Sequence, residues 1–244
     1  MRFTEKVAIV AGGGQGIGAA IAIALAAEGA QVSVWDINED GAKETVTKIE
    51  AKQGQSQAVK MNVLDYAQVK AGVDQVVKEF GKLDIMISTV GGGKFMPFQH
   101  CTAEFFQQQV SFNLYSVFNC AHAVLGPMLE KDYGKMLFFI SATGGTPNLV
   151  GYQAGKAGIV SVIQTMVAEL AKTKLNINAI NPNMTDTPLT RDAFNAIPNG
   201  DKVLEQMAAS KPLGINTPEN VAKLALFLVS DDATRLTGQI ITSL

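Results

Sequence analysis

Short apolar segments alternate with longer helical segments along almost the whole chain, and this alternation constrains the fold more than any other feature. We predict strands over residues 6–11, 31–36, 57–63, 83–88, 135–141, 175–180 and 238–242. Between them the periodicity predicts helices over 16–29, 40–52, 66–80, 103–131, 151–174 and 218–230. Connections of this length favour right-handed β-α-β units. The pattern therefore predicts an α/β fold: a doubly wound parallel sheet of about seven strands with helices on both faces.

We expect one domain over residues 1–244, because no linker, repeat or low-complexity tract interrupts the pattern. Apolar residues make up 47% of the chain, which excludes disorder for most of it. The net charge of −2 without a basic stripe argues against nucleic acid as a partner. The longest apolar run, Ala19–Ala27, is too short to span a membrane. Two cysteines and no secretory signal predict a cytoplasmic protein.

The stretch 181–213 departs from the regular alternation. It contains four prolines, and we predict irregular structure there. Irregular segments of this length in a compact protein are often functional loops. We therefore expect a substrate lid within about 183–213.

A cluster of glycines follows the first predicted strand and opens the first helix. Gly12, Gly16 and Gly18 have the spacing G-x-x-x-G-x-G, with Gln15 and Ile17 between them. Glycines allow a tight turn and let a pyrophosphate approach the free amides at a helix N-terminus. The cluster alone is equally compatible with an ordinary strand-to-helix turn.

Asp36 closes the second predicted strand, 18 residues after Gly18. An acidic side chain at this place can accept hydrogen bonds from an adenosine ribose. Its carboxylate would repel a 2′-phosphate, and the next residue, Ile37, offers no cation to bind one. The pair favours NAD over NADP, although an ordinary polar strand end is the alternative interpretation.

Tyr152 and Lys156 are four residues apart near the start of a predicted helix, which places them on one face. A free phenol has a pKa of about 10 and is a poor base at neutral pH. A nearby ammonium favours the phenolate and lowers this pKa. Such a pair could relay the proton of an alcohol. The spacing alone also arises by chance in many helices.

Taken together, these motifs resemble the short-chain dehydrogenase/reductase family over nearly the whole chain. The glycine turn resembles the family's T-G-x-x-x-G-I-G, with Ala11 in place of the threonine, and Tyr152 and Lys156 match its Y-x-x-x-K. Asn113, followed by Leu114 and later Phe118, is similar to its helix asparagine, and Ser141 to its strand-end serine. The resemblance implies a Rossmann-like fold and an oxidoreductase that interconverts a secondary alcohol and a ketone.

The resemblance also implies roles for individual residues. Tyr152 would be the acid–base, and Lys156 would lower its pKa and hold the nicotinamide ribose. Ser141 would orient the substrate oxygen, and Asn113 would hold a water in a proton relay. The implied NAD-binding residues are Gly12, Gln15, Gly16, Ile17, Gly18, Asp36, Ile37, Asn62, Val63, Val90, Gly91, Tyr152, Lys156 and Thr187.

Several positions depart from the family pattern. Ser88-Thr89-Val90-Gly91 stands where N-N-A-G is usual, and hydroxyls would there replace amides. Asn62 replaces an aspartate, and Asn183 replaces a glycine whose left-handed backbone asparagine tolerates. The sequence ends at Leu244, where the family usually continues into a V-D-G-G-like tail that contributes to a subunit interface. These departures motivate an alternative, a non-catalytic subunit paired with an active homologue.

The candidate substrate pocket is largely apolar, which favours a hydrophobic or cyclic alcohol. Its expected walls are Phe95, Met96, Phe98, Leu149, Val150 and Met184. A hydroxyacyl-CoA is one candidate, with Lys94, Arg191 and Lys202 facing its acidic groups.

The 3-oxoacyl-carrier-protein reductases are also similar, but they usually prefer NADPH. No histidine or cysteine spacing suits a metal. By resemblance, the helices over 103–131 and 151–174 would form a homodimer or homotetramer interface.

Overall fold

The computed structural model describes residues 1–141 and 145–243, so Leu244 and residues 142–144, directly after Ser141, lie outside the described residues. Seven parallel strands form one sheet in the order β3-β2-β1-β4-β5-β6-β7. The strands are β1 (Val7–Ala11), β2 (Gln31–Asp36), β3 (Gln55–Lys60), β4 (Ile85–Ser88), β5 (Gly134–Phe139), β6 (Leu175–Asn181) and β7 (Ile240–Thr242). The predicted doubly wound parallel sheet is confirmed.

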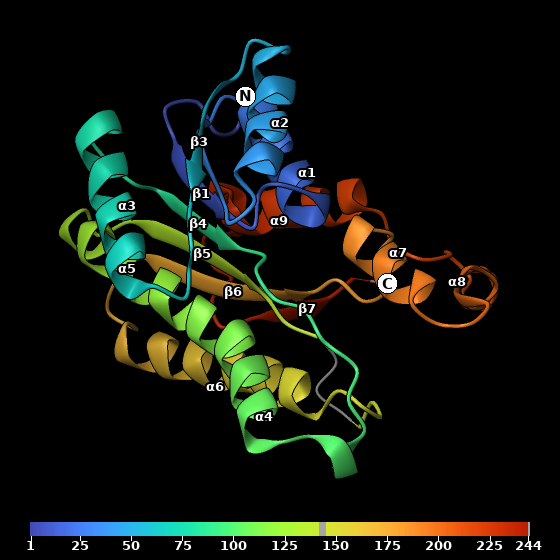
Figure 1. Cartoon of the computed structure of the whole chain (residues 1–244). Coiled ribbons are helices and arrows are strands. Elements are labelled where there is room, and N and C mark those ends of the chain that lie inside the picture. Colours follow the sequence, from blue (N-terminus) through green and yellow to red (C-terminus); the bar gives the residue numbers. More distant parts are fainter. Residues whose placement is uncertain (142–144, 244) are drawn as a thin grey trace.

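Helices cover both faces of the sheet (Figure 1). One face packs against α1 (Gly16–Ala27), α2 (Glu39–Glu50) and α9 (Pro218–Val229). The other packs against α3 (Tyr66–Phe80), α5 (Ser116–Glu130) and α6 (Val150–Glu169). Along β1, Val7 and Ile9 belong to the core beneath α3, α5 and α6. Ala8 and Val10 belong to the core beneath α1, α2 and α9. Both faces are buried, which explains why this strand is apolar at every position.

The structure corrects the prediction of irregular structure over 181–213. Two helices lie there, α7 (Pro188–Asn195) and α8 (Gly200–Ala209). The Thr187 hydroxyl accepts a hydrogen bond from the Thr190 amide, and Pro188 occupies the first turn of α7. Proline is tolerated at that position because its missing N–H would have no partner in the helix. The prolines here mark helix boundaries rather than a loop.

The predicted long helix over 103–131 is interrupted. It consists of α4 (Ala103–Val110), a π-helical turn η2 (Ser111–Tyr115) and α5. Asn113 lies in this turn and is fully buried. Single π turns within helices often occur at functional sites, because they change the direction of the side chains that they carry.

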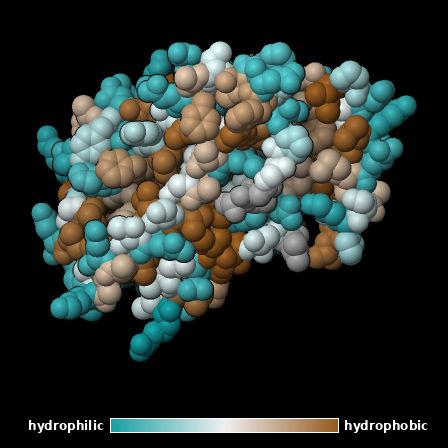
Figure 2. Space-filling view, turned by 90° about the horizontal axis from the view of Figure 1, so that it is seen from below, coloured by the Kyte–Doolittle hydropathy of each residue, from teal (hydrophilic) through white to brown (hydrophobic). Residues whose placement is uncertain are grey.

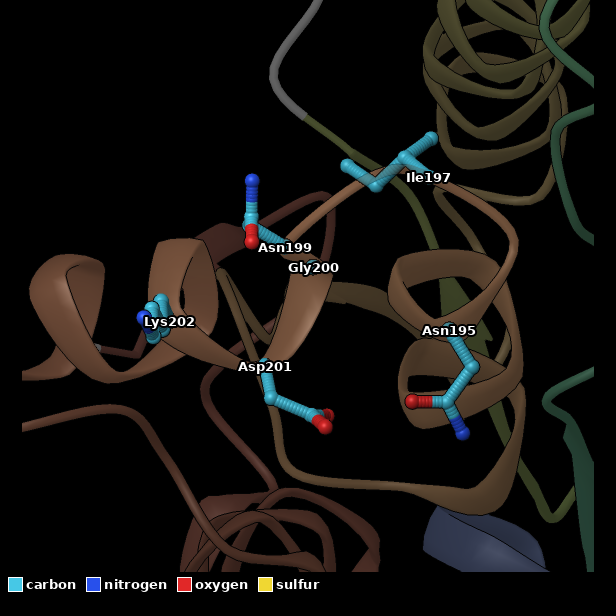
Figure 3. A pocket seen from close by; sticks show the side chains of 6 residues that line it. All are labelled: Asn195, Ile197, Asn199, Gly200, Asp201 and Lys202. Atoms are coloured by element: carbon cyan, nitrogen blue, oxygen red, sulfur yellow. The ribbon is translucent and has the colours of Figure 1, made fainter.

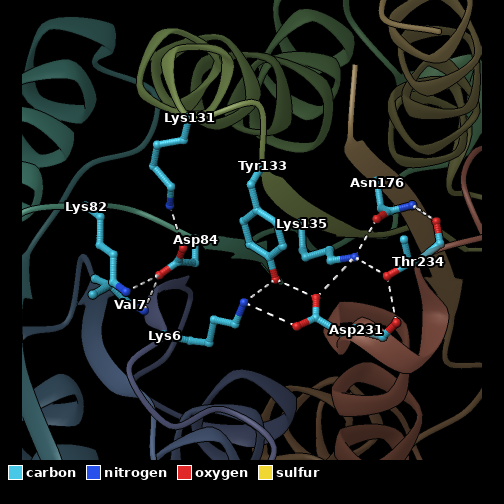
Figure 4. Close-up of polar contacts among 10 residues, drawn as sticks. All are labelled: Lys6, Val7, Lys82, Asp84, Lys131, Tyr133, Lys135, Asn176, Asp231 and Thr234. Atoms are coloured by element: carbon cyan, nitrogen blue, oxygen red, sulfur yellow. Dashed lines mark hydrogen bonds and ion pairs between the residues drawn. The ribbon is translucent and has the colours of Figure 1, made fainter. Parts of the chain in front are cut away.

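A polar network crosses the amino-terminal edge of the sheet, opposite the edge that carries the predicted site (Figure 4). Buried Asp84 accepts a hydrogen bond from the Val7 amide at 2.9 Å and pairs with Lys131 at 2.5 Å. Buried Lys135 donates to Asn176 at 2.5 Å. These contacts join the starts of β1, β4, β5 and β6. None of the helices in the described ranges is long and apolar enough to cross a membrane.

We expect Asp84→Ala to lower the free energy of unfolding by about 3 kcal/mol, because it leaves the buried Val7 amide without its acceptor and the Lys131 ammonium without its carboxylate partner. Urea unfolding measures this loss. Asp74→Ala, which removes an exposed carboxylate paired with Lys70, is the matched control and should cost under about 1 kcal/mol. Equal effects of the two substitutions would contradict a stabilising role for the network.

Candidate active site

The predicted site residues converge on the carboxyl edge of the sheet, where β1 lies between β2 and β4. The chain leaves β1 toward β2 on one side and leaves β4 toward β5 on the other. The connections after β1 and β4 therefore diverge. In open α/β sheets, ligands bind in the crevice that such a reversal of strand order creates.

The glycine turn after β1 has no room for side chains. A Cβ built on Gly18 would lie 2.0 Å from the Gly12 carbonyl oxygen, and Gly12 and Gly16 have φ of +77° and +55°. Gln15 precedes α1, and its side chain makes no capping hydrogen bond. The helices α6 and α8 also begin without a side-chain cap, whereas side chains cap α2, α3, α4, α7 and α9. The open N-terminus and bare backbone fit a pyrophosphate group.

The carboxylate of Asp36 is held in place by two backbone amides. Gly14 N–H donates to Oδ2 and Asn38 N–H to Oδ1, both at 2.9 Å. A carboxylate can accept about four hydrogen bonds, so both oxygens keep a free lone pair. Ile37, beside it, is 66% exposed and leaves space for a larger side chain.

The loop after β3 lies next to Asp36, because the Met61 amide donates to the Asp36 carbonyl at 2.8 Å. Within this loop, Oδ1 of Asn62 accepts from the Leu64 amide at 3.1 Å. The Val63 carbonyl accepts from Nδ2 of Asn119 on α5 at 2.9 Å. The loop is therefore ordered by contacts within the protein.

Thr89 joins the loop after β4 to the glycine turn. Its hydroxyl lies 3.1 Å from the Ala11 carbonyl and 3.2 Å from the Gly12 carbonyl, and can donate to either. A hydroxyl thus supports the turn at the position where the family usually has an amide. Val90 lies against the same turn, since a Cβ on Gly12 would be 3.2 Å from a Val90 methyl.

Tyr152 and Lys156 lie one turn apart on α6. Nζ of Lys156 donates to the Phe139 carbonyl at the end of β5, at 2.7 Å. Burial lowers the pKa of Lys156 to about 8. Burial also raises the pKa of Tyr152, and the nearby Ser141 hydroxyl lowers it by a smaller amount. The structure therefore brings Ser141, Tyr152 and Lys156 together.

The direction of the Tyr152 shift differs from the expectation. The sequence predicts that the Lys156 ammonium lowers the pKa of this phenol, whereas in the structure the pKa is raised. The physical reason is desolvation, which disfavours the charged phenolate. Lys156 is directed to the Phe139 carbonyl, and its own ammonium is disfavoured by the same burial.

Asn113 holds the loop that follows β4. Its Oδ1 accepts from the Gly92 amide and its Nδ2 donates to the Gly92 carbonyl, each at 3.0 Å. Nδ2 also donates to the Gln109 carbonyl at 2.9 Å. Both N–H donors of the side chain are therefore used, so a water bound by this side chain would have to donate to Oδ1.

The loop over Gly91, Gly92 and Gly93 passes close to both catalytic candidates. A Cβ on Gly91 would lie 2.5 Å from Nζ of Lys156. A Cβ on Gly93 would lie 3.1 Å from Cγ of Tyr152. Bare backbone thus forms one wall of the site.

The predicted substrate residues are only partly brought together. Leu149 lies against Gly93, Val150 opens α6, and Met96 donates its amide to the Asn148 carbonyl at 2.8 Å. Phe98 is 79% exposed and Phe95 57%. These two side chains point largely into solvent, because no element of the described chain covers them.

The start of α7 closes the other side of the crevice. A Cβ on Gly16 would lie 3.4 Å from the Thr187 side chain, and one on Gly92 would lie 3.5 Å from Leu189. The Met184 carbonyl just before it accepts from the Asn216 amide at 2.8 Å. Thr187 therefore lies beside the glycine turn.

The suggested cations for an acidic substrate are placed less favourably. Arg191 makes two 2.6 Å contacts with the carboxylate of Asp186, so its guanidinium already has an anionic partner. Lys202 lies at a hollow of about 340 Å³ between the end of α7 and the start of α8 (Figure 3). Its lining residues are Asn195, Ile197, Asn199, Gly200, Asp201 and Lys202, none of which is a predicted catalytic or coenzyme residue.

The lowered pKa of Lys156 predicts a pH dependence of stability. Between about pH 8 and 10.5 the unfolded chain still binds this proton and the folded chain does not. Stability therefore rises with pH across this window. We expect the free energy of unfolding of the native protein, relative to Lys156→Met, to increase between pH 8 and 10. The control Lys172→Met, at an exposed position, should show no such trend, and a constant difference for Lys156→Met would contradict the assignment.

Two residues of the site could not be identified from the motifs. Gln109 is 6% exposed, and its Oε1 accepts from the Lys94 amide at 3.1 Å. Asn119 is equally buried and holds Val63. Gln109 lies four residues before Asn113 on the same helical face, and this spacing is the sequence feature that could have identified it as a site residue. Asn119 was not detectable, because its partner is a backbone carbonyl distant in sequence.

Comparisons with known proteins place these findings in context. Residues 11–243 match the family model described as "Enoyl-(Acyl carrier protein) reductase". The chain is 32% identical to the 3-oxoacyl-(acyl-carrier-protein) reductase FabG of Thermotoga maritima, over 99% of this chain and 97% of that protein. The structure is similar to levodione reductase, with a TM-score of 0.94, 30% identity and coverage of 99% and 96%. It is also similar to a 7α-hydroxysteroid dehydrogenase complexed with NADH and 7-oxo glycochenodeoxycholic acid, with a TM-score of 0.91, 29% identity and coverage of 99% and 94%.

Proposed function

The chain belongs to the short-chain dehydrogenase/reductase family of oxidoreductases, and from this premise we propose that it interconverts a secondary alcohol and a ketone with NAD(H). The observation that carries the proposal is the cluster at the carboxyl edge of the sheet. There Tyr152 is half-buried, lies beside the Ser141 hydroxyl, and is one helical turn from Lys156. A glycine turn with an open helix N-terminus lies across the same crevice.

Tyr152 is the proposed acid–base. In the oxidative direction its phenolate takes the hydroxyl proton of the alcohol, and in the reductive direction the phenol returns it. Bound NAD supplies the hydride acceptor. The Ser141 hydroxyl orients the substrate oxygen toward Tyr152. General acid–base catalysis of this kind contributes roughly 10²–10⁴-fold to the rate.

Lys156 and Asn113 have supporting roles in this proposal. The Lys156 ammonium, held by the Phe139 carbonyl, would donate to the nicotinamide ribose and favour the phenolate when the site is occupied. Oδ1 of Asn113 would accept from a water that passes the proton onward. Its amide also fixes Gly92, so Asn113 acts on the shape of the site as well.

The proposed coenzyme is NAD rather than NADP. Support comes from the carboxylate of Asp36, which its two amide donors hold at the end of β2, and from exposed Ile37. The further proposed contacts are Gly12, Gln15, Gly16, Ile17, Gly18, Asn62, Val63, Val90, Gly91 and Thr187. A structural relative complexed with NADH is consistent with this choice.

The proposed substrate is hydrophobic or cyclic. We propose that Met96, Leu149 and Met184 give the crevice an apolar side, and relatives named for levodione and a hydroxysteroid support a substrate of this kind. A hydroxyacyl-CoA is a further proposed substrate. We propose Lys94 rather than Arg191 as the cation for its acidic groups, because Arg191 is already paired with Asp186. The segment 183–213, with α7 and α8, is the proposed lid.

An acyl-carrier-protein reductase is the second candidate function. The relationship to FabG of Thermotoga maritima supports it. Asp36 disfavours NADPH, the coenzyme that such enzymes usually prefer. Activity with NADPH on a 3-oxoacyl thioester, exceeding that with NADH, would favour this candidate.

We also propose that the protein forms a homodimer or homotetramer through α4, α5 and α6. The surface of α4, η2 and α5 exposes Phe106, Phe112, Tyr115, Phe118 and Leu129. Hydrophobic residues are visible on the face seen from below (Figure 2). Exposed apolar residues in such number often mark an interaction surface.

The cytoplasmic location expected from the sequence stays a prediction.

The alternative from another class is a non-catalytic subunit that binds a dinucleotide. Fluorescence titration with NADH, followed by a panel of secondary alcohols and ketones, separates the two. We expect NADH binding with turnover of at least one hydrophobic or cyclic substrate. Binding without turnover of any panel member would favour the non-catalytic subunit.

A further inference from the structure

We propose that Gln109 is a positioning residue that holds the backbone over residues 91–94 against Tyr152. The proposal rests on the proposed function for its catalytic consequence, but its structural part can be tested without activity. Gln109 lies in the last turn of α4 and packs against Gly151 at the start of α6. The two helices lie side by side in Figure 1.

The loop over residues 91–94, which Gln109 holds, has a flexible backbone because it is rich in glycine. Three consecutive glycines, Gly91, Gly92 and Gly93, lose more backbone freedom on folding than other residues would. Gly91 nevertheless lies against Lys156, and Gly93 against Tyr152. A displacement of this loop would therefore change the surroundings of both side chains.

Two side chains anchor the loop on either side of Gly93. Asn113 makes two hydrogen bonds with Gly92, one to its amide and one from Nδ2 to its carbonyl. Oε1 of Gln109 accepts from the Lys94 amide at 3.1 Å. Without the second anchor, Gly93 would be restrained from one side only.

Gln109 is itself fixed from three directions. It is 6% exposed, and a Cβ built on Gly151 would lie 2.7 Å from the Gln109 Cβ. Its carbonyl accepts from Nδ2 of Asn113. The residue thus connects the first turn of α6, where Tyr152 follows Gly151, with the π turn and with the loop.

Three variants separate the hydrogen bond from packing. Gln109→Met keeps the length of the side chain and removes the acceptor. Gln109→Glu keeps an acceptor oxygen for the Lys94 amide. Gln108→Met, at the exposed neighbouring position, is the matched control.

Amide hydrogen exchange of the coenzyme-free protein tests the anchor directly. We expect the Lys94 amide of Gln109→Met to exchange at least about fivefold faster than in the native protein, as the loss of one hydrogen bond implies. Gln109→Glu and Gln108→Met should stay within about twofold. An unchanged Lys94 amide in Gln109→Met, or equally fast exchange in Gln109→Glu, would overturn the proposal.

Kinetics with a substrate found in the panel test the catalytic consequence. We expect Gln109→Met to lower kcat by about 10-fold or more, with an NADH dissociation constant within about threefold, and Gln109→Glu to restore most of kcat. Water admitted to Tyr152 would also move the pH profile of kcat to lower pH, since burial raises the pKa of this phenol. A purely structural role would lower the melting temperature and leave kcat per active site and its pH profile unchanged, and that result would overturn the positioning role. An inactive native protein would instead contradict the proposed function, while hydrogen exchange would still decide the anchor.

Discussion

Tyr152→Phe is expected to lower kcat by about 10²–10⁴-fold while the NADH dissociation constant stays within about threefold. The substitution removes only the hydroxyl that would exchange a proton with the substrate. The ring remains to pack against Gly93, so the crevice keeps its shape. Steady-state kinetics and fluorescence titration measure the two quantities on the same preparation.

The matched control for this variant is Tyr66→Phe. Tyr66 lies on α3, and its hydroxyl is hydrogen-bonded to His122 at 2.8 Å. This control should retain native kcat. A Tyr152→Phe protein with near-native turnover would show that the proton moves by another route. If the variant loses both NADH binding and turnover, Tyr152 acts mainly in forming the coenzyme site.

Replacing Asp36 with Ala and Ile37 with Arg together should shift the ratio of kcat/KM for NADPH over NADH by about 100-fold in favour of NADPH. The change removes a carboxylate that repels a 2′-phosphate and adds a guanidinium that can bind it with charge-assisted hydrogen bonds. Such bonds contribute about 1.5–3 kcal/mol, and each 1.4 kcal/mol corresponds to a tenfold change. Ile37 is 66% exposed, so the arginine fits without repacking.

Ile37→Arg alone is the control, because it keeps the carboxylate. We expect it to shift the ratio by less than the double variant does. Asp36 also accepts the Gly14 and Asn38 amides, so weaker binding of both coenzymes is expected in the double variant. The ratio, rather than either affinity, carries the test, and an unchanged ratio would contradict the assignment of Asp36 to the ribose.

The sequence predicted the sheet well because its central strands are buried on both faces. In β1 every residue is buried and apolar, and β5 is buried throughout and apolar after Lys135; such runs are distinct from helical periodicity. The sequence does not predict α7 and α8, because the four prolines of the segment favour a loop. The structure places Pro188 in the first helical turn, where it is compatible with a helix.

The site was predictable as far as its motifs were local in sequence. Tyr152 and Lys156 share a helix, and Asn183 adopts the left-handed backbone expected of it, with φ of +55°. The sign of the Tyr152 pKa shift was not predictable, because desolvation depends on how deeply the tertiary structure buries the ring. The bond from Lys156 to the Phe139 carbonyl was not predictable either, since it joins two elements whose distance the spacing does not fix.

The central claim is that hydride passes between a carbinol carbon and NAD beside Tyr152. The most direct measurement uses the native protein, NAD and secondary alcohols deuterated at the carbinol carbon, cyclic members included. Mass spectrometry of the recovered coenzyme should show one deuterium per reduced nucleotide for at least one alcohol, and the transfer should be lost in Tyr152→Phe. Coenzyme that binds but returns without deuterium from every alcohol tried would contradict the account.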